Sequence, residues 1–299
     1  MNPRADAQFF GKRIVIFGCG YVGSEVARQA LEWGLRVTAL TRNEAKALEL
    51  RAAGIETFVA DLASDSWHEH IAGAPEFALD CVSSGGDGLD GYRRSYLDGM
   101  KSILAWARQR GSIGSLVYTS STSVYPQGGG IHVDESAPTA GASDRGQILL
   151  EAEAALRDSV GACARWFVLR LAGIYGPGRH ALLEKIRTGV IPGRGEHRLN
   201  LAHRDDICAA VWRALGAPAS IRNEIFNVAD DTAARKDEVA NWLAARLGIA
   251  PPRFTESAVA GRRPVTPDRI IANGKLRAVL GWQPRYPTFR EGYENILSR

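Results

Sequence analysis

The chain contains 299 residues, of which 45% are hydrophobic and 23% are charged, as in ordinary soluble globular proteins. The net charge of +4 is small and dispersed, so we expect no nucleic-acid partner. No apolar stretch approaches the roughly 18 residues that a membrane span needs. Met1 to Gly11 also carries no apolar secretory segment, so we expect a cytoplasmic protein with no membrane partner.

A glycine-rich turn follows the first predicted strand, residues 13–17. The apolar run from Ile14 to Phe17 leads into G-x-G-x-x-G, and a helical pattern follows over residues 22–33. In such a unit the first glycine permits a tight turn, the second lets the main chain approach a pyrophosphate, and the third lets the helix pack on the strand. The helix N-terminus attracts the phosphates. We therefore predict a dinucleotide site rather than an incidental turn, with contacts from Gly18, Cys19, Gly20, Tyr21, Val22 and Gly23.

The end of the second predicted strand, residues 36–40, bears on the choice of cofactor. An NAD-binding fold usually carries an acidic residue here for the ribose 2′-hydroxyl. This chain has Thr41 and Arg42 instead, and a guanidinium suits a 2′-phosphate. The sequence therefore predicts NADP in preference to NAD. The alternative is an exposed arginine at a helix entrance, with Glu44 or Glu49 binding the adenosine ribose.

Strands and helices continue to alternate over the first two thirds of the chain. Further strands are predicted at 55–59, 77–82, 115–119 and 166–170, and further helices at 44–53, 92–109 and 147–159. This pattern predicts an α/β fold with a doubly wound parallel Rossmann sheet, right-handed crossovers and a ligand at the carboxyl ends of the strands.

Polar residues follow the third and fourth predicted strands. We expect Asp61 and Leu62 to meet the adenine. We expect Ser83-Ser84-Gly85-Gly86 to pass beside the pyrophosphate and the nicotinamide ribose. Asp and Gly also commonly do no more than end a strand.

Beyond residue 170, glycines and prolines divide the chain into shorter pieces. The sequence predicts a helix at 204–215, a strand at 224–228, a helix at 236–247 and short helices at 273–280 and 288–297. The glycines at 128–130 predict a loop rather than a linker. We expect residues 1–170 to form mainly the dinucleotide-binding domain and 171–299 mainly a smaller α/β substrate lobe, interleaved in one compact unit.

The cysteines, Cys19, Cys81, Cys163 and Cys208, are widely separated and form no C-x-x-C, so we expect reduced and mostly buried side chains. Cys19 lies in the glycine turn, where residue size explains it better than redox sensing. Trp67-His68-Glu69-His70 does not predict a metal site, because two imidazoles two residues apart on a predicted helix face different sides and have no third ligand.

Several segments in the same chain carry recognisable spacings: V-Y-T-S-S-T-S-V-Y at 117–125, R-L-A-G-I-Y-G-P-G at 170–178, N-L-A-H-R-D-D-I at 200–207, F-N-V at 226–228 and L-G-W-Q-P at 280–284. Together they resemble the extended short-chain dehydrogenase/reductases, the group of nucleotide-sugar epimerases and dehydratases. The resemblance spans roughly residues 12–297, although that group more often has G-x-x-G-x-x-G. It implies an NAD(P) cofactor with further contacts from Thr119, Leu171 and Ala172, a small-molecule substrate, and a homodimer through helices 92–109 and 147–159.

The catalytic Tyr-x-x-x-Lys pair of that group is missing. In the matching stretch Arg145 and Glu151 align, which places Ser143 at the tyrosine position and Gln147 at the lysine position. A serine hydroxyl is a far poorer acid than a phenol, and a neutral amide cannot lower a neighbouring pKa by charge. The proton relay of the group therefore cannot operate through these residues.

Other residues are candidates for the lost role. Ser121 matches the group's substrate-polarising serine, and Tyr125 offers a phenol at a position that lines the site in that group without acting as the relay. His132, Asp134, Glu135 and His203 are further candidates for proton transfer. Each also has a structural interpretation: a packed aromatic for Tyr125, a solvated loop for Asp134 and Glu135, and a helix-entrance side chain for His203. The catalytic positions are therefore Ser121, Tyr125, Ser143 and Gln147.

Three functions remain. The retained substrate-side residues favour an NAD(P)-dependent oxidoreductase or epimerase/dehydratase-like enzyme, acting on a small hydroxylated, nucleotide-sugar-like substrate with a rearranged site. Ser143 and Gln147 favour the alternative, a catalytically impaired NAD(P)-binding sensor or regulatory protein. The glycine turn argues against a purely structural partner. We expect the enzyme, although fold resemblance alone does not name its substrate.

Overall fold

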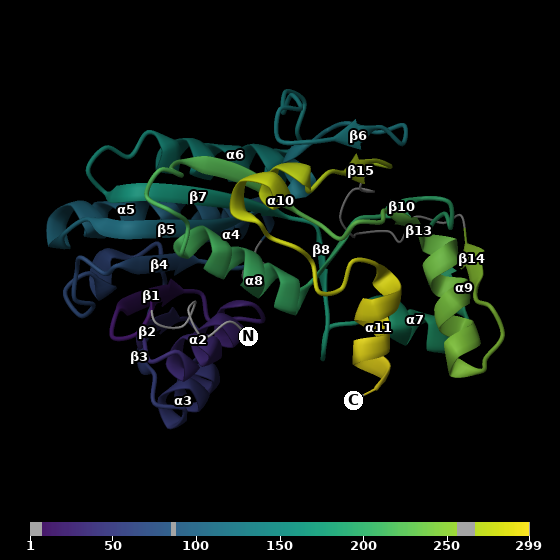
Figure 1. The fold of residues 1–299 in the computed structure, drawn as a ribbon, viewed down its shortest axis with the longest axis horizontal. Coiled ribbons are helices and arrows are strands. Elements are labelled where there is room, and N and C mark those ends of the chain that lie inside the picture. Colours follow the sequence, from purple (N-terminus) through teal and green to yellow (C-terminus); the bar gives the residue numbers. More distant parts are fainter. Residues whose placement is uncertain (1–7, 85–87, 256–266, 299) are drawn as a thin grey trace. The chain divides into compact units, whose positions relative to one another are not determined.

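The computed structural model describes residues 8–84, 88–255 and 267–298 (Figure 1). The chain forms two compact units. Unit 1 comprises Met1–Val124, Ala142–Arg170 and Cys208–Phe226. Unit 2 comprises Tyr125–Gly141, Leu171–Ile207 and Asn227–Arg299. The expected boundary near residue 170 is thus one of several places where the chain passes between the units.

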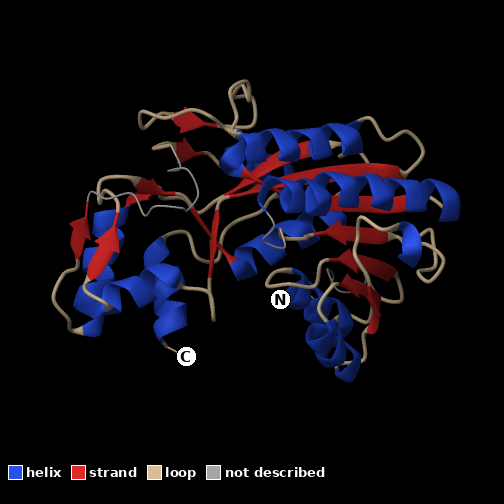
Figure 2. Cartoon of the chain, turned by 180° about the vertical axis from the view of Figure 1, so that it is seen from behind, coloured by secondary structure: helices blue, strands red, loops and turns tan. Residues whose placement is uncertain are grey.

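The described part of the chain contains a seven-stranded sheet in the order β12-β7-β5-β4-β1-β2-β3. Its strands are β1 (Arg13–Phe17), β2 (Arg36–Thr41), β3 (Glu56–Val59), β4 (Phe77–Asp80), β5 (Ile113–Ser121), β7 (Cys163–Leu171) and β12 (Glu224–Val228). The pairs from β5 to β3 are parallel. Strand order reverses between β1 and β4, where a doubly wound sheet places its ligand. The predicted Rossmann sheet is therefore confirmed (Figures 1 and 2).

The helices that accompany the sheet are α2 (Gly23–Glu32), α3 (Glu44–Ala52), α4 (Gly88–Arg93), α5 (Gly99–Arg110), α6 (Asp144–Arg157) and α8 (Arg204–Leu215). The helix predicted at 92–109 begins earlier and contains a π-helical turn, Arg94–Asp98, between α4 and α5. The helix predicted at 147–159 begins at Asp144 because the Ser143 side chain caps it. The apolar periodicity shows neither where a side-chain cap starts a helix nor where a single turn is π-helical, so it missed both features.

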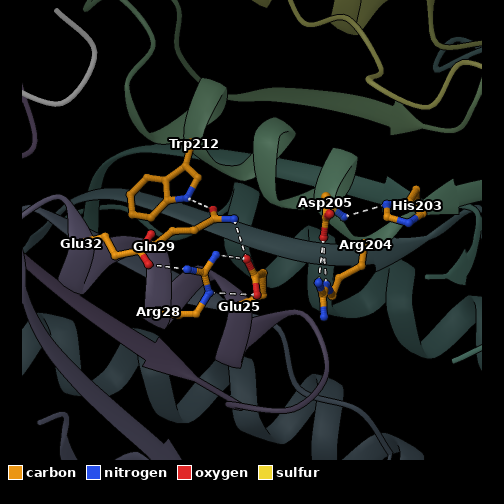
Figure 3. Close-up of polar contacts among 8 residues, drawn as sticks. All are labelled: Glu25, Arg28, Gln29, Glu32, His203, Arg204, Asp205 and Trp212. Atoms are coloured by element: carbon orange, nitrogen blue, oxygen red, sulfur yellow. Dashed lines mark hydrogen bonds and ion pairs between the residues drawn. The ribbon is translucent and has the colours of Figure 1, made fainter. Parts of the chain in front are cut away.

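Aromatic side chains distinguish the two faces of the sheet. Phe77 on β4 meets Phe9, whose ring also contacts Trp33 after α2 and Trp212 of α8. In addition, the Trp212 Nε1–H donates to Gln29 Oε1 of α2 at 2.8 Å (Figure 3). Phe77 pairs with Ile14 of β1. Phe17 lies three residues further along β1, so its side chain points to the opposite face of the sheet. There its ring centroid lies 5.8 Å from that of Trp106 of α5. Helices α2 and α8 thus cover one face and α5 covers the other.

The segment around His68 is not the predicted helix. A single 3-10 turn, Asp65–Trp67, precedes it, and a further turn follows. The buried His68 ring lies 2.9 Å from Ser102 Oγ, whereas His70 is exposed. Among the residues that the structure describes, no group of three or more His, Cys, Asp or Glu side chains is arranged to hold a metal ion.

Unit 2 contains short strands and helices. Its strands are β6 (His132–Val133), β8 (Gly173–Tyr175), β9 (Val190–Pro192), β10 (Arg198–Leu199), β11 (Leu201–His203), β13 (Ala234–Arg235), β14 (Arg253–Thr255) and β15 (Ile270–Ile271). Its helices are α7 (Ala181–Arg187), α9 (Lys236–Leu247), α10 (Gly274–Leu280) and α11 (Phe289–Leu297). Figure 2 shows the short strands in red, separated by loops. Helices α7, α9 and α11 share a core that includes Leu183, Leu243 and Phe289.

The sequence predicted most of these helices but missed α7 and the two- and three-residue strands. Such strands are too short to show a period of two residues. The structure describes all four cysteines, and no disulfide joins them, as expected. Cys19 and Cys208 are buried, whereas Cys81 and Cys163 are only partly buried. Within the described ranges, no helix is long and apolar enough to cross a membrane.

Candidate functional site

The glycine turn after β1 has a different constraint at each glycine. Gly18 has a φ of +92°, and a Cβ there would lie 2.7 Å from the Cα of Val82. A Cβ on Gly23 would lie 2.4 Å from the Gly18 carbonyl oxygen. A Cβ on Gly20, in contrast, would meet no described atom within 4 Å. Gly18 and Gly23 are therefore required by the fold, whereas Gly20 borders open space of the kind that a pyrophosphate needs.

The N-terminus of α2 completes this cradle. Its N-cap residue, Val22, provides no side-chain hydrogen bond to the helix. In the first turn the N–H groups of Ser24 and Glu25 donate to the carbonyls of Gly20 and Val22, each at 3.0 Å. The helix N-terminus carries the positive end of the helix dipole, which favours an anion there. The turn is itself ordered, because the Ser24 hydroxyl donates to the Cys19 carbonyl at 2.8 Å. These residues fit the phosphates of a dinucleotide.

The thiols next to the turn are neutral. Burial raises the pKa of Cys19 to about 12, so it is not the thiolate that a redox sensor needs. Burial also raises the pKa of Cys81 well above its usual value, and its Sγ donates to the Gly18 carbonyl at 3.0 Å. Both cysteines therefore act as small packing residues of the turn.

Arg42, just after the carboxyl end of β2, lies near the segment that follows β4. Arg42 is exposed, and its Nη2 lies 3.4 Å from the Ser83 carbonyl oxygen. The Asn43 side chain caps α3 by accepting from Lys46 N at 2.9 Å, and the Thr41 hydroxyl accepts from Asn43 N at 3.2 Å. Lys46 also pairs with Glu49 at 2.8 Å, so that carboxylate already has a partner. No acidic side chain lies at the end of β2 itself.

Asp61 follows β3 at the same edge of the sheet. Its Oδ1 accepts from Ala63 N at 3.0 Å and its Oδ2 from Arg94 Nε at 2.7 Å. Partial burial raises the pKa of Asp61, but the hydrogen bonds from Arg94 and Ala63 and the charges of Arg94 and Arg42 outweigh it, so the pKa is below its ordinary value. The neighbouring Leu62 is buried, and a Cβ on Gly99 would lie 2.9 Å from its Cδ2.

Strand β4 ends at Asp80, two residues earlier than predicted, and an irregular segment with Ser83 and Ser84 follows. Gly85 and Gly86 lie outside the described residues. Asp80 is fully buried, which raises its pKa to about 7 despite a hydrogen bond from Val82 N. The Thr119 hydroxyl donates to the Asp80 carbonyl at 3.2 Å, so Thr119 joins β5 to β4.

The residues at the positions of the missing pair lie on the first turn of α6. The Ser143 hydroxyl accepts from Gly146 N at 3.3 Å, and Gln147 Nε2 donates to the Ala142 carbonyl at 3.4 Å. A Cβ on Gly146 would lie 3.0 Å from the Ser123 carbonyl oxygen. This turn therefore packs against the segment that follows Ser121, whose hydroxyl accepts from Ser123 N at 3.1 Å.

The aligned neighbours have structural contacts. The Arg145 guanidinium lies 5.3 Å from the ring centroid of Tyr92, and Glu151 pairs with Arg93 at 2.7 Å. The start of α6 thus presents a hydroxyl and an amide, without a phenol or an ammonium group.

The candidates in unit 2 are largely engaged. Tyr125 is 1% exposed, and its hydroxyl donates to Asn227 Oδ1 at 2.9 Å. Leu171 ends β7, and Ala172 N donates to the Val228 carbonyl at 3.0 Å. Glu135 accepts from Asn227 N at 2.6 Å, and burial raises the pKa of Glu135.

Of the remaining acid–base candidates in unit 2, Asp134 and His203 have structural hydrogen bonds. The Asp134 carboxylate accepts from the N–H and hydroxyl of Ser136, which lowers the pKa of Asp134. His132 lies exposed on β6. His203 ends β11, and its Nδ1 accepts from Asp205 N at 3.2 Å (Figure 3), which agrees with the helix-entrance interpretation.

Sequence reasoning missed two polar arrangements. Arg94 reaches Asp61 from a π-helical turn 33 positions away, and no spacing predicts that contact. Asp206 accepts from Arg285 N at 2.6 Å and Tyr286 N at 3.1 Å, joining the start of α8 to the segment before α11. Asp206 lies in the segment 200–207 that supported the family resemblance, but the sequence did not predict what its carboxylate contacts.

Comparisons with known proteins show which sequences and folds this chain is similar to. Residues 14–229 match the sequence profile of the NAD dependent epimerase/dehydratase family. Protein YeeZ of Escherichia coli strain K12 is 28% identical, and the match covers 92% of this chain and 97% of that protein. A 3-diazoavenalumate denitrifying reductase of Streptomyces is 31% identical over 54% of this chain and 55% of the enzyme.

One solved structure illustrates the shared fold. The UDP-glucose 4-epimerase of Thermotoga maritima, solved with UDP-glucose, superposes with a TM-score of 0.81. The match covers 96% of this chain and 97% of the epimerase. At 18% identity this likeness establishes the fold and not the substrate.

Proposed function

Because the chain belongs to the NAD dependent epimerase/dehydratase family, we propose that it is an enzyme that binds NADP(H) in preference to NAD(H) and uses it to oxidise or reduce a small hydroxylated substrate. The observation that carries the cofactor preference is Arg42 at the end of β2, in the place where an NAD-binding fold usually has a carboxylate. Its guanidinium is exposed, and its contact with the Ser83 carbonyl is long, so it can turn to a 2′-phosphate.

The rest of unit 1 would hold the other parts of the cofactor. Gly20 and the N-terminus of α2 would receive the pyrophosphate, and Asp61 would accept a hydrogen bond from the adenine amino group. When bound, the nicotinamide supplies or accepts a hydride. The dinucleotide-binding residues of the proposal therefore come from the ends of β1, β2 and β3.

Substrate handling would differ from that of a family member with the Tyr–Lys pair. We assign to Ser121 the hydrogen bond to the substrate oxygen, because it ends β5 and its hydroxyl still has a proton to donate. Ser143 caps α6 and Gln147 is neutral, so we assign proton exchange with the substrate to water rather than to either side chain. The named reductase relative supports an oxidoreductase, without extending its substrate to this chain.

The cofactor proposal can be tested on freshly purified protein. Native mass spectrometry should detect a co-purifying dinucleotide, and calorimetry should give tighter binding of NADPH than of NADH. Tighter binding of NADH would contradict the preference, and binding of neither would contradict the dinucleotide site.

The proposal that the protein is an enzyme is tested by measuring turnover of candidate substrates. We expect NADPH oxidation with one or more members of a panel of small carbonyl compounds, or NADP reduction with hydroxylated compounds that include nucleotide sugars. Tight NADPH binding without turnover of any compound would favour the sensor alternative, which the neutral Ser143 and Gln147 side chains support.

A further inference from the structure

Arg94 is half-exposed and directed at a residue of the proposed cofactor site. Its Nε donates to Asp61 Oδ2 at 2.7 Å, although the two residues lie 33 positions apart. It is the first residue of the π-helical turn Arg94–Asp98. Such turns are rare and occur frequently at functional sites.

The two consecutive arginines at the start of the π-helical turn have different partners. Arg93, the last residue of α4, pairs with Glu151 of α6 at 2.7 Å. Arg94 turns instead to Asp61, at the carboxyl edge of the sheet. The two ion pairs are similarly exposed: 46% and 45% for the side chains of Arg93 and Glu151, and 55% and 32% for those of Arg94 and Asp61. Exposed pairs contribute little to stability, so neither arginine is needed for the fold.

The Arg94 contact orients the Asp61 carboxylate. One oxygen is held by the Ala63 N–H at 3.0 Å and the other by Arg94. Each carboxylate oxygen has a second lone pair, and an ionised carboxylate can only accept hydrogen bonds. The adenine 6-amino group is a donor, whereas the 6-oxo group of hypoxanthine is an acceptor. A carboxylate fixed in this way discriminates between the two bases.

We propose that Arg94 is a positioning residue for base recognition: it holds the Asp61 carboxylate in one orientation so that the site selects adenine dinucleotides over hypoxanthine dinucleotides. This inference rests on the proposed cofactor site. Arg94 acts through Asp61 and does not itself contact the base or the 2′-phosphate.

The test is calorimetry with NADPH and with reduced nicotinamide hypoxanthine dinucleotide phosphate. The parent should prefer NADPH by roughly tenfold or more, the usual effect of one hydrogen bond to a charged group. Arg94→Ala should lose most of that preference, chiefly by weaker binding of NADPH. Arg93→Ala is the matched control, because it removes the neighbouring, similarly exposed ion pair, and it should keep the preference.

Two further arms separate this role from others. Arg94→Lys should restore part of the preference, because it returns the charge near Asp61. Arg94→Ala should weaken the binding of NADH as much as that of NADPH, because both cofactors contain adenine.

Several outcomes would overturn the inference. An equal loss for NADPH, NADH and the hypoxanthine cofactor would make Arg94 a direct ligand of a group that all three share. A loss shared by NADPH and the hypoxanthine dinucleotide phosphate but absent for NADH would make Arg94 a ligand of the 2′-phosphate, and unchanged affinities would give it no role. Failure of the parent to bind any of these dinucleotides would instead remove the proposed cofactor site itself.

Discussion

The carboxylate of Glu153 on α6 is bound in two places by the guanidinium of Arg170 on β7, with Nε–Oε1 at 3.1 Å and Nη2–Oε2 at 2.6 Å. Both side chains are 5% exposed. The Ser120 hydroxyl of β5 also donates to Glu153 Oε1 at 2.6 Å. This buried pair joins helix α6 to strands β5 and β7 within unit 1.

Breaking the buried pair should destabilise the protein strongly. Glu153→Ala leaves the Arg170 charge without its carboxylate, and removing one partner of a buried ion pair costs about 3–5 kcal/mol. Urea denaturation should show that loss of unfolding free energy. Glu151→Ala, two positions along the same helix, removes an exposed pair and should change the unfolding free energy by less than about 1 kcal/mol. Similar effects in the two variants would refute a structural role for the buried pair.

Bulk at Gly20 should block cofactor binding without harming the fold. A Cβ there meets no described atom within 4 Å, so Gly20→Val is tolerated until a pyrophosphate must approach. We expect no measurable NADPH binding by calorimetry and a melting temperature close to that of the parent. Gly23→Val is the contrasting variant: its Cβ would collide with the Gly18 carbonyl, so stability should fall as well. Parental affinity for NADPH in Gly20→Val would exclude the proposed phosphate site.

Removal of Arg42 should lower the affinity for NADPH but not the affinity for NADH. A charge-assisted contact to a 2′-phosphate contributes about 1.5–3 kcal/mol, so Arg42→Ser should weaken NADPH roughly tenfold or more and leave NADH nearly unchanged. Arg36→Ser, at the opposite end of β2, is the control and should alter neither. Equal losses for both cofactors would show that Arg42 does not bind the 2′-phosphate.

Stability should fall as pH rises from about 4 to 8. Burial raises the pKa of Asp230 to about 8, with smaller contributions from the charges of Asp231 and Asp206. Between its unfolded and folded pKa values Asp230 holds one more proton in the folded state, which contributes a decrease of about 1.4 kcal/mol in the free energy of unfolding for each pH unit. Asp80, whose pKa burial raises to about 7, adds to this decrease at lower pH.

Asp230→Asn should therefore reduce that slope, most clearly between pH 7 and 8, and stabilise the protein at pH 9, as urea titrations at several pH values would measure. Asp134→Asn is the control: its carboxylate has a lowered pKa and is already ionised at pH 5, so the slope between pH 5 and 8 should persist. A parent whose unfolding free energy rises over this range would contradict the buried, protonated state of Asp230.

The serine variants test the catalytic assignment. Ser143→Ala removes the cap of α6, which costs about 0.5–2 kcal/mol of stability, but it should preserve turnover. Ser121→Ala should lower kcat, because we place the substrate hydrogen bond there. Steady-state rates with the substrate identified from the panel decide this, measured well below the melting temperatures. A severe loss in Ser143→Ala with normal turnover in Ser121→Ala would reverse the two roles.

Restoring the missing pair tests the alignment. Ser143→Tyr with Gln147→Lys returns a phenol and the cation that lowers its pKa, so the double variant should raise hydride transfer above that of Ser143→Tyr alone. An unassisted phenol titrates near about 10 and should contribute little at pH 7. Equal rates in the single and double variants would mean that position 147 does not face position 143 in the manner of the family.

Local pattern was sufficient for much of the fold. Strand β12 and helices α8 and α9 have the bounds predicted from periodicity, because several turns or alternations of apolar residues occur within each segment. The parallel sheet followed from the alternation of strands and helices. The strained geometry of Gly18 and the close packing at Gly23 followed from a motif whose residues are neighbours in the chain.

Tertiary structure alone decided the arrangements that join distant residues. Arg94 with Asp61 and Glu153 with Arg170 depend on which elements pack together, and a half-exposed arginine carries no periodic signal of its partner. The apolar pattern predicted one continuous α-helix over residues 92–109 and did not show the π-helical turn Arg94–Asp98. The buried states of Tyr125 and Asp230 likewise depend on contacts across unit 2, because burial is a property of the packed core and not of a residue's neighbours in the chain.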